Sequence, residues 1–215
     1  MKNVYIYCEG PTEESFINEI LYPYFLNIGI FVYPIICETK RTPVRKYKGG
    51  VSDYNKIKRE LSMLCKSHPN EHITTMFDFY AMPDNTPGID FRANNLIDQI
   101  TTIEAAINDD IGQRNCKFHF MLHEFEGILF SHPDSFRLIA EPDTVASVQA
   151  IRDQYPTPEH INNSPETAPS KRLEALIPNY AKVKNGTLLA LNMGIDVIMQ
   201  ECPHFKNWIN EIANL

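Results

Sequence analysis

The chain opens with residues 3–8, NVYIYC, which are followed directly by Glu9-Gly10-Pro11. A short run that is apolar at nearly every position is typical of a strand buried on both faces of a sheet. Glu9-Gly10-Pro11 ends this strand, and a helix capped by Thr12 is predicted to follow, with Pro23 as an expected kink. A buried strand that leads straight into a helix predicts an α/β protein.

Apolar periodicity predicts three further strands and two further helices before residue 140. The predicted strands are residues 30–37, 72–80 and 117–122, and the predicted helices carry residues 54–64 and 96–107. Pro34 favours an edge position or a bulge for the second strand, because proline cannot donate a hydrogen bond to a neighbouring strand. Strands that alternate with helices predict a parallel sheet flanked by helices.

Beyond about Ala140 the pattern changes to helices separated by polar loops. The predicted helices are residues 173–180, 187–200 and 203–214, and residues 154–170 form a loop with four prolines. The sequence therefore predicts an α/β core at residues 1–140 and a helical extension at 141–215 that packs on this core.

Charge and cysteine content limit the class of protein. The 215 residues carry a net charge of −7, yet residues 39–59 hold eight basic residues and one acid. Such a segment can bind a polyanion, although a solvated loop and helix face explain it equally simply. The five cysteines are scattered without a C-x-x-C pair, which argues against disulfides and a structural zinc site. Without a secretory signal or an apolar run of about 18 residues, the expected location is the cytoplasm, with no membrane partner.

Acidic side chains follow three of the predicted strands. Glu9 follows the first strand, Asp78 lies near the end of the third, Glu124 and Glu126 follow the fourth, and Glu13 lies in the first turn of the first helix. Ligands of open parallel sheets gather at the carboxyl ends of the strands. Five carboxylates there repel each other unless cations compensate, and an all-oxygen shell suits Mg²⁺ or Mn²⁺. Simpler explanations remain: Glu13 can complement the helix dipole, and Glu9 can belong to a surface turn.

Several familiar catalytic motifs are absent from the sequence. His123-Glu124-Phe125-Glu126-Gly127 lacks the second histidine of an H-E-x-x-H zinc helix, and no P-loop, G-x-G-x-x-G or G-x-S-x-G occurs. His123 can assist a site, although a single histidine at a strand end is more often a hydrogen-bonded neighbour.

The motifs of residues 8–14 (CEGPTEE), 77–80 (FDFY) and 123–127 (HEFEG) resemble Toprim-type proteins of bacterial phage-defence loci. They are most similar to the family called domain of unknown function four-two-seven-six, whose members occur beside ATPase genes. The resemblance extends over roughly residues 1–190 and includes Ser170-Lys171-Arg172-Leu173-Glu174 and residues 180–184.

Related nucleases of the overcoming-lysogenization-defect type bind two divalent ions through corresponding acids. The resemblance implies that Glu9, Glu13 and Asp78 are metal ligands, with Glu124 or Glu126 as a further acid. The usual Toprim D-x-D becomes Asp78-Phe79-Tyr80 here, so Tyr80 replaces the second aspartate. The sequence is therefore compatible with either one or two bound metal ions.

The resemblance implies a metal-dependent nuclease that hydrolyses DNA or RNA in antiviral defence with an ATPase partner. The expected catalytic residues are Glu9, Asp78, Glu126 and Lys171. The residues expected to bind the nucleic acid are Lys40, Arg41, Arg45, Lys46, Lys48 and Arg172. The alternative is a catalytically weak Toprim-like module that binds nucleic acid or a protein partner. A homodimer fits either hypothesis.

Overall fold

A parallel five-stranded sheet forms the centre of the protein. The computed structural model describes residues 2–37, 53–161 and 166–215. In this part of the chain the strands have the order β2-β1-β3-β4, and β5 also pairs with β3. Their bounds are β1 (Lys2–Cys8), β2 (Ile30–Ile36), β3 (His72–Asp78), β4 (Cys116–Lys117) and β5 (Phe120–Met121). The predicted α/β class is confirmed, and Pro34 lies in edge strand β2 as expected.

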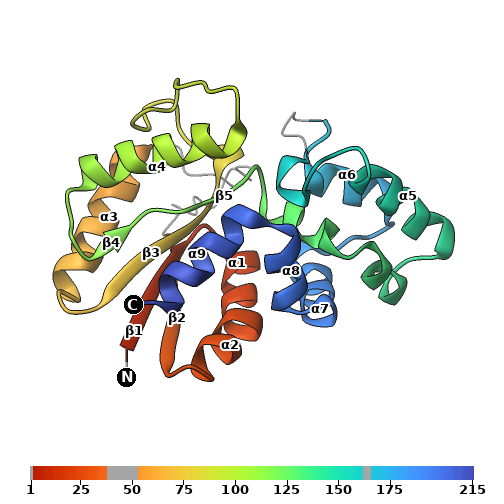
Figure 1. Ribbon diagram of the computed structural model, residues 1–215, viewed down its shortest axis with the longest axis horizontal. Helices are drawn as coiled ribbons and strands as arrows, with labels where there is room; N and C mark the ends of the chain where they lie inside the picture. Colours follow the sequence, from red (N-terminus) through yellow and green to blue (C-terminus); the bar gives the residue numbers. More distant parts are fainter. Residues whose placement is uncertain (1, 38–52, 162–165) are drawn as a thin grey trace, which may run out of the picture.

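One face of the sheet packs against the first helical segment (Figure 1). This segment consists of α1 (Pro11–Phe16), the π-helical η1 (Ile17–Leu21) and α2 (Tyr22–Leu26). Val4 and Ile6 of β1 point into its core cluster. The N–H of Tyr22 donates to the carbonyl of Ile17, five residues back. The π-helical register just before Pro23 accommodates a residue that has no N–H of its own to donate.

The other face is covered by α3 (Tyr54–Ser67) and α4 (Leu96–Ile111), which lie across the strands from α1 and α2 in Figure 1. Asp53 caps α3 by accepting a hydrogen bond from the N–H of Asn55. Gly112 ends α4 in a left-handed conformation, with φ +63°. Helices therefore cover both faces, as a parallel sheet requires.

The predicted strand at 117–122 is divided into β4 and β5. Between them, the hydroxyl of Thr75 accepts from the N–H of His119 and donates to the carbonyl of His119, both at 2.8 Å. A threonine side chain thus replaces the backbone pairing at this point. The polypeptide then continues in the short helices η3 (Phe125–Ser131) and η4 (Pro133–Leu138), and η2 (Phe79–Ala81) follows β3.

Six helices and turns complete the described chain: α5 (Pro142–Arg152), η5 (Pro158–His160), α6 (Pro169–Leu176), α7 (Lys182–Met193), α8 (Ile195–Glu201) and α9 (Pro203–Ala213). The prediction of one helix at 187–200 is wrong, because Gly194, with φ +78°, separates α7 from α8. Figure 1 shows α9 returning to the sheet, where the indole N–H of Trp208 donates to the hydroxyl of Thr74 at 2.9 Å. The division into 1–140 and 141–215 stays a prediction.

Among the described residues, every helix falls short of the length and apolarity that a bilayer span demands.

Candidate functional site

The carboxyl ends of β1, β3 and β5 meet at one edge of the sheet. Glu9 follows β1, Asp78 is the last residue of β3, and Glu124 comes three residues after β5. The main-chain N–H of Asp78 donates to the Glu9 carboxylate. The N–H of Phe125 donates to Oδ1 of Asp78 at 2.9 Å. These hydrogen bonds join the three strand ends and bring Glu9 and Asp78 together.

Two further carboxylates are buried at the same edge. Glu13 of α1 has 7% of its surface exposed and Glu126 of η3 has 3%. Burial, followed by the charges of Glu9 and Glu126, raises the pKa of Glu13 to about 7. Burial also raises the pKa of Glu126. Both side chains are therefore harder to ionise than an exposed glutamate, although a nearby positive charge counteracts part of this effect at Glu126.

Glu124 is held by the beginning of a helix. Its Oε2 accepts a hydrogen bond of 2.9 Å from the N–H of Ser170, in the first turn of α6. The free N–H groups and the dipole of a helix N-terminus favour a carboxylate in this position. Glu124 is thereby tied to a segment that lies 46 residues away in the sequence.

Asp78 experiences the charges of all the other acids. Burial, and then the charges of Glu13, Glu9, Glu126 and Glu124, raise its pKa well above the ordinary value. The structure therefore brings together all five carboxylates that the sequence analysis names, which we call the acidic cluster. Their roles as metal ligands stay predictions. An all-oxygen donor set of this kind suits a hard cation such as Mg²⁺ or Mn²⁺.

A lysine that the sequence analysis did not name as a site residue lies beside the acidic cluster. Nζ of Lys182, at the start of α7, lies 3.5 Å from Oε1 of Glu126. Burial alone lowers the pKa of Lys182, but Glu126, Glu124, Glu174 and Asp78 together raise it. Residues 180–184 belong to the stretch that resembles the family, but the resemblance assigns Lys182 no role, and a lysine at a helix start has no distinctive spacing.

Two polar groups near the acidic cluster are buried without a hydrogen-bond partner, namely Nδ1 of His123 and the hydroxyl of Tyr180. His123 has φ +65°, a conformation that is uncommon outside glycine and that directs the chain into Glu124. Burial, followed by the charge of His160, lowers the pKa of His123 to about 4. The imidazole is therefore neutral at pH 7.

Nearly the whole sequence matches one protein family. A model of the family described as Domain of unknown function (DUF4276) matches residues 8–213. The chain belongs to the DUF4276 family. Neither a curated protein nor a solved structure matches it. The matched region of this DUF4276 member contains all five carboxylates of the acidic cluster, so the whole cluster lies within the part of the sequence that defines the family.

The other predicted site residues lie elsewhere. Nζ of Lys171 bonds to exposed Glu174, and the guanidinium of Arg172 donates to the carbonyl of Thr167 and to the hydroxyl of Tyr155. These contacts of Lys171 and Arg172 are with residues outside the acidic cluster. The predicted nucleic-acid ligands Lys40, Arg41, Arg45, Lys46 and Lys48 fall outside the described residues.

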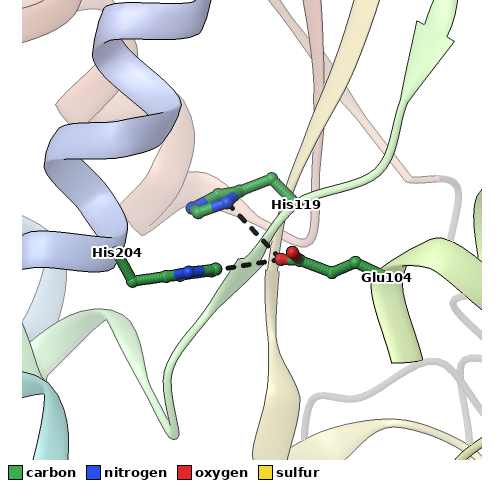
Figure 2. Close-up of side chains that lie close together, drawn as sticks. All are labelled: Glu104, His119 and His204. Atoms are coloured by element: carbon green, nitrogen blue, oxygen red, sulfur yellow. Dashed lines mark hydrogen bonds and ion pairs between the residues drawn. The ribbon is translucent and has the colours of Figure 1, made fainter. Parts of the chain in front are cut away.

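The structure also reveals a second group of polar side chains in this DUF4276 member. Figure 2 shows Glu104 of α4 facing His119, from the connection between β4 and β5, and His204 of α9. Within the described chain they are the one group of three or more such side chains whose ligand atoms all lie within 4.8 Å of one another. One glutamate and two histidines so placed could bind a metal ion. The carboxylates of the acidic cluster are spread more widely.

No sequence signal would have found this group. Its members are separated by 15 and 85 residues and come from three elements that meet through tertiary packing.

Proposed function

We propose that this DUF4276 member is a divalent-metal-dependent phosphodiester hydrolase that cleaves DNA or RNA. The observation that carries the proposal is the mutual repulsion of five carboxylates at the ends of three parallel strands. Such an arrangement costs free energy in the absence of a cation, and functional sites are where such costs are commonly retained. We further propose that the protein acts in antiviral defence with an ATPase partner, in line with the Toprim-like motifs.

The proposed metal ligands are Glu9, Glu13, Asp78, Glu124 and Glu126, and the ion is Mg²⁺ or Mn²⁺. The donor set fits such an ion, because every side chain offers oxygen and the charges that raise the pKa of Asp78 are all negative. A bound ion would supply Lewis-acid polarisation of a phosphoryl oxygen and activation of water. Tyr80, 41% exposed, stands where Toprim proteins have a second aspartate, so the number of ions remains open.

The protein's own groups have separate roles in this proposal. The main-chain N–H groups of Asp78 and Phe125 orient the carboxylates of Glu9 and Asp78. Lys182 offsets part of the negative charge and offers a cation to a substrate phosphate. Lys171 remains a proposed catalytic residue. The basic residues at 40–48, with Arg172, are proposed to hold the nucleic-acid backbone.

The test is cleavage of plasmid DNA and of single-stranded RNA by the full chain with Mg²⁺ or Mn²⁺, compared with EDTA. The informative variant is Asp78→Asn, and Asp98→Asn on the exposed surface of α4 is its matched control. We expect metal-dependent cleavage that Asp78→Asn abolishes and Asp98→Asn leaves unchanged. Cleavage that survives Asp78→Asn would contradict the proposal.

A catalytically weak module that binds nucleic acid or a protein partner is the second candidate. The wide spacing of the carboxylates and the exposed Tyr80 in place of an acid favour it. Binding of labelled DNA or RNA in EDTA, without cleavage when Mg²⁺ or Mn²⁺ is added, would support this candidate. Sedimentation of the same samples would test the homodimer.

A further inference from the structure

Glu104, His119 and His204 form a compact cluster on the α4 side of β4 and β5, which we call the histidine cluster. Oε1 of Glu104 lies 3.1 Å from Nε2 of His204 and 3.5 Å from Nδ1 of His119. The two imidazole rings stack with their centroids 4.6 Å apart. One carboxylate oxygen is therefore shared by two imidazoles, as Figure 2 shows.

The position of each side chain is fixed by its surroundings. The N–H of Phe120 donates to Oε1 of Glu104 at 2.8 Å. The ring of His119 lies between His204 and Trp208, and its plane is within 3° of the indole plane. His204 lies in the first turn of α9, where its N–H donates to Oε2 of Glu159. Side chains held in this way are preorganised, which is the requirement for a precise ligand set.

His119 carries a ring nitrogen that the protein leaves unpartnered. The residue is 4% exposed, and its Nε2 is fully buried without a hydrogen-bond partner. An ion pair with Glu104 requires a single histidine, and His204 already provides it at 3.1 Å. The second imidazole is therefore not explained by charge pairing. The unpartnered Nε2 is not the ring nitrogen that faces Glu104; Nδ1 lies 3.5 Å from Oε1 of Glu104 and is the nitrogen placed to share a ligand with it.

A pocket gives access to the histidine cluster. Its volume is about 250 Å³, and its lining includes all three side chains together with Thr101, Lys117 and Trp208. No member of the acidic cluster lines this pocket. The two groups are therefore separate sites, and ligand binding by the histidine cluster is independent of the proposed nuclease function.

We propose that the histidine cluster binds a divalent transition-metal ion, with Zn²⁺ as the expected occupant. In a tetrahedral site with bonds of about 2.0–2.1 Å, neighbouring ligand atoms lie about 3.3 Å apart. The nitrogen–oxygen distances of 3.1 and 3.5 Å lie on either side of this value. Imidazole nitrogen favours zinc and similar ions over Mg²⁺. Three protein ligands leave a fourth position for water or a small ligand from the pocket.

The first test is isothermal titration of the metal-stripped full chain with Zn²⁺ in excess Mg²⁺, which occupies oxygen-only sites. We expect one equivalent of Zn²⁺ to bind with a Kd of about 1 μM or lower. Glu104→Gln and His204→Gln should each weaken binding more than tenfold. Glu211→Gln, which changes another carboxylate of the same pocket, is the matched control and should bind as the native chain does. Binding that the variants leave unchanged would overturn the proposal.

The second test uses the native protein alone, so that it does not depend on the folding of a variant. Replacement of Zn²⁺ by Co²⁺ should give visible d–d absorption without a thiolate-to-metal charge-transfer band. The free cysteines would produce such a band if they held the ion instead. A thiolate band, or no binding of Co²⁺, would contradict the proposal. In the titration of the first test, Asp78→Asn should leave Zn²⁺ binding unchanged, which separates this site from the acidic cluster.

Discussion

The N–H of Phe125 donates a 2.9 Å hydrogen bond to Oδ1 of Asp78, and this bond joins the end of β3 to the start of η3. Asp78→Asn keeps an oxygen acceptor for this bond but removes the charge that four other carboxylates oppose. We therefore expect the metal-free variant to be as stable as the native chain, or more stable.

The same variant should lose the stabilisation that Mg²⁺ or Mn²⁺ confers. Thermal unfolding with and without 5–10 mM metal, roughly the concentration needed to exceed a weak Kd, measures both effects. Asp98→Asn should behave as the native protein does. A native-like metal-induced rise in Tm for Asp78→Asn would exclude this carboxylate as a ligand.

Glu13 should make stability depend on pH. Its pKa is about 7 in the folded protein and close to 4.5 when the chain is unfolded. Between these values the folded state keeps a proton that the unfolded state has lost. The free energy of unfolding therefore falls as pH rises from 4.5 to 7, by roughly 3 kcal/mol in total.

Glu13→Gln should remove this dependence. Urea unfolding at pH 4.5 and 8 should give equal stabilities for variant and native chain at the lower pH. At pH 8 the variant should be the more stable by a large part of those roughly 3 kcal/mol. Exposed Glu19→Gln is the control, and parallel pH profiles for Glu13→Gln and the native chain would contradict the shifted pKa.

The sequence predicts the sheet because each buried strand is a local pattern and each intervening helix has a local apolar stripe. It also predicts which edge carries Glu9, Asp78 and Glu124, since parallel strands all end at the same edge. The break at Gly194 was missed. An isolated glycine within an apolar pattern is compatible with a continuous helix, and nothing in the local pattern indicates that this glycine adopts a φ of +78°.

The parts that the sequence does not predict depend on contacts between distant segments. Lys182 reaches Glu126 because α7 packs beside η3, and His204 reaches Glu104 because α9 returns to the sheet. Neither pair has a characteristic spacing along the chain. The split between β4 and β5 likewise depends on the Thr75 side chain. Its hydroxyl forms hydrogen bonds with both the N–H and the carbonyl of His119, in place of backbone groups of a neighbouring strand.

Lys182 should stabilise the folded protein through its ion pair with the buried carboxylate of Glu126. The Lys182 side chain is 43% exposed, so solvent screening limits the expected cost of Lys182→Met to about 0.5–1 kcal/mol. In the double variant with Glu126→Gln this cost should vanish, because no buried charge is left unpaired. Urea unfolding at pH 7.5 measures the cycle. Lys171→Met, which breaks the exposed pair with Glu174, is the control and should cost less than about 0.5 kcal/mol.

The variant Tyr180→Phe distinguishes a structural role of the Tyr180 hydroxyl from a functional one. Its hydroxyl is buried without a partner, and burial, followed by the charges of Glu126 and Glu174, raises its pKa, so the phenol keeps its proton. Removing an unsatisfied buried hydroxyl relieves a cost of about 1 kcal/mol, which corresponds to a rise in Tm of roughly 2–4 °C for Tyr180→Phe. If the O–H also donates to a substrate phosphate, the same variant should cleave nucleic acid more slowly than the native chain. Tyr33→Phe on exposed edge strand β2 should change neither quantity. A fall in Tm for Tyr180→Phe would mean that the hydroxyl is satisfied in the folded protein and would refute its assignment as a free donor.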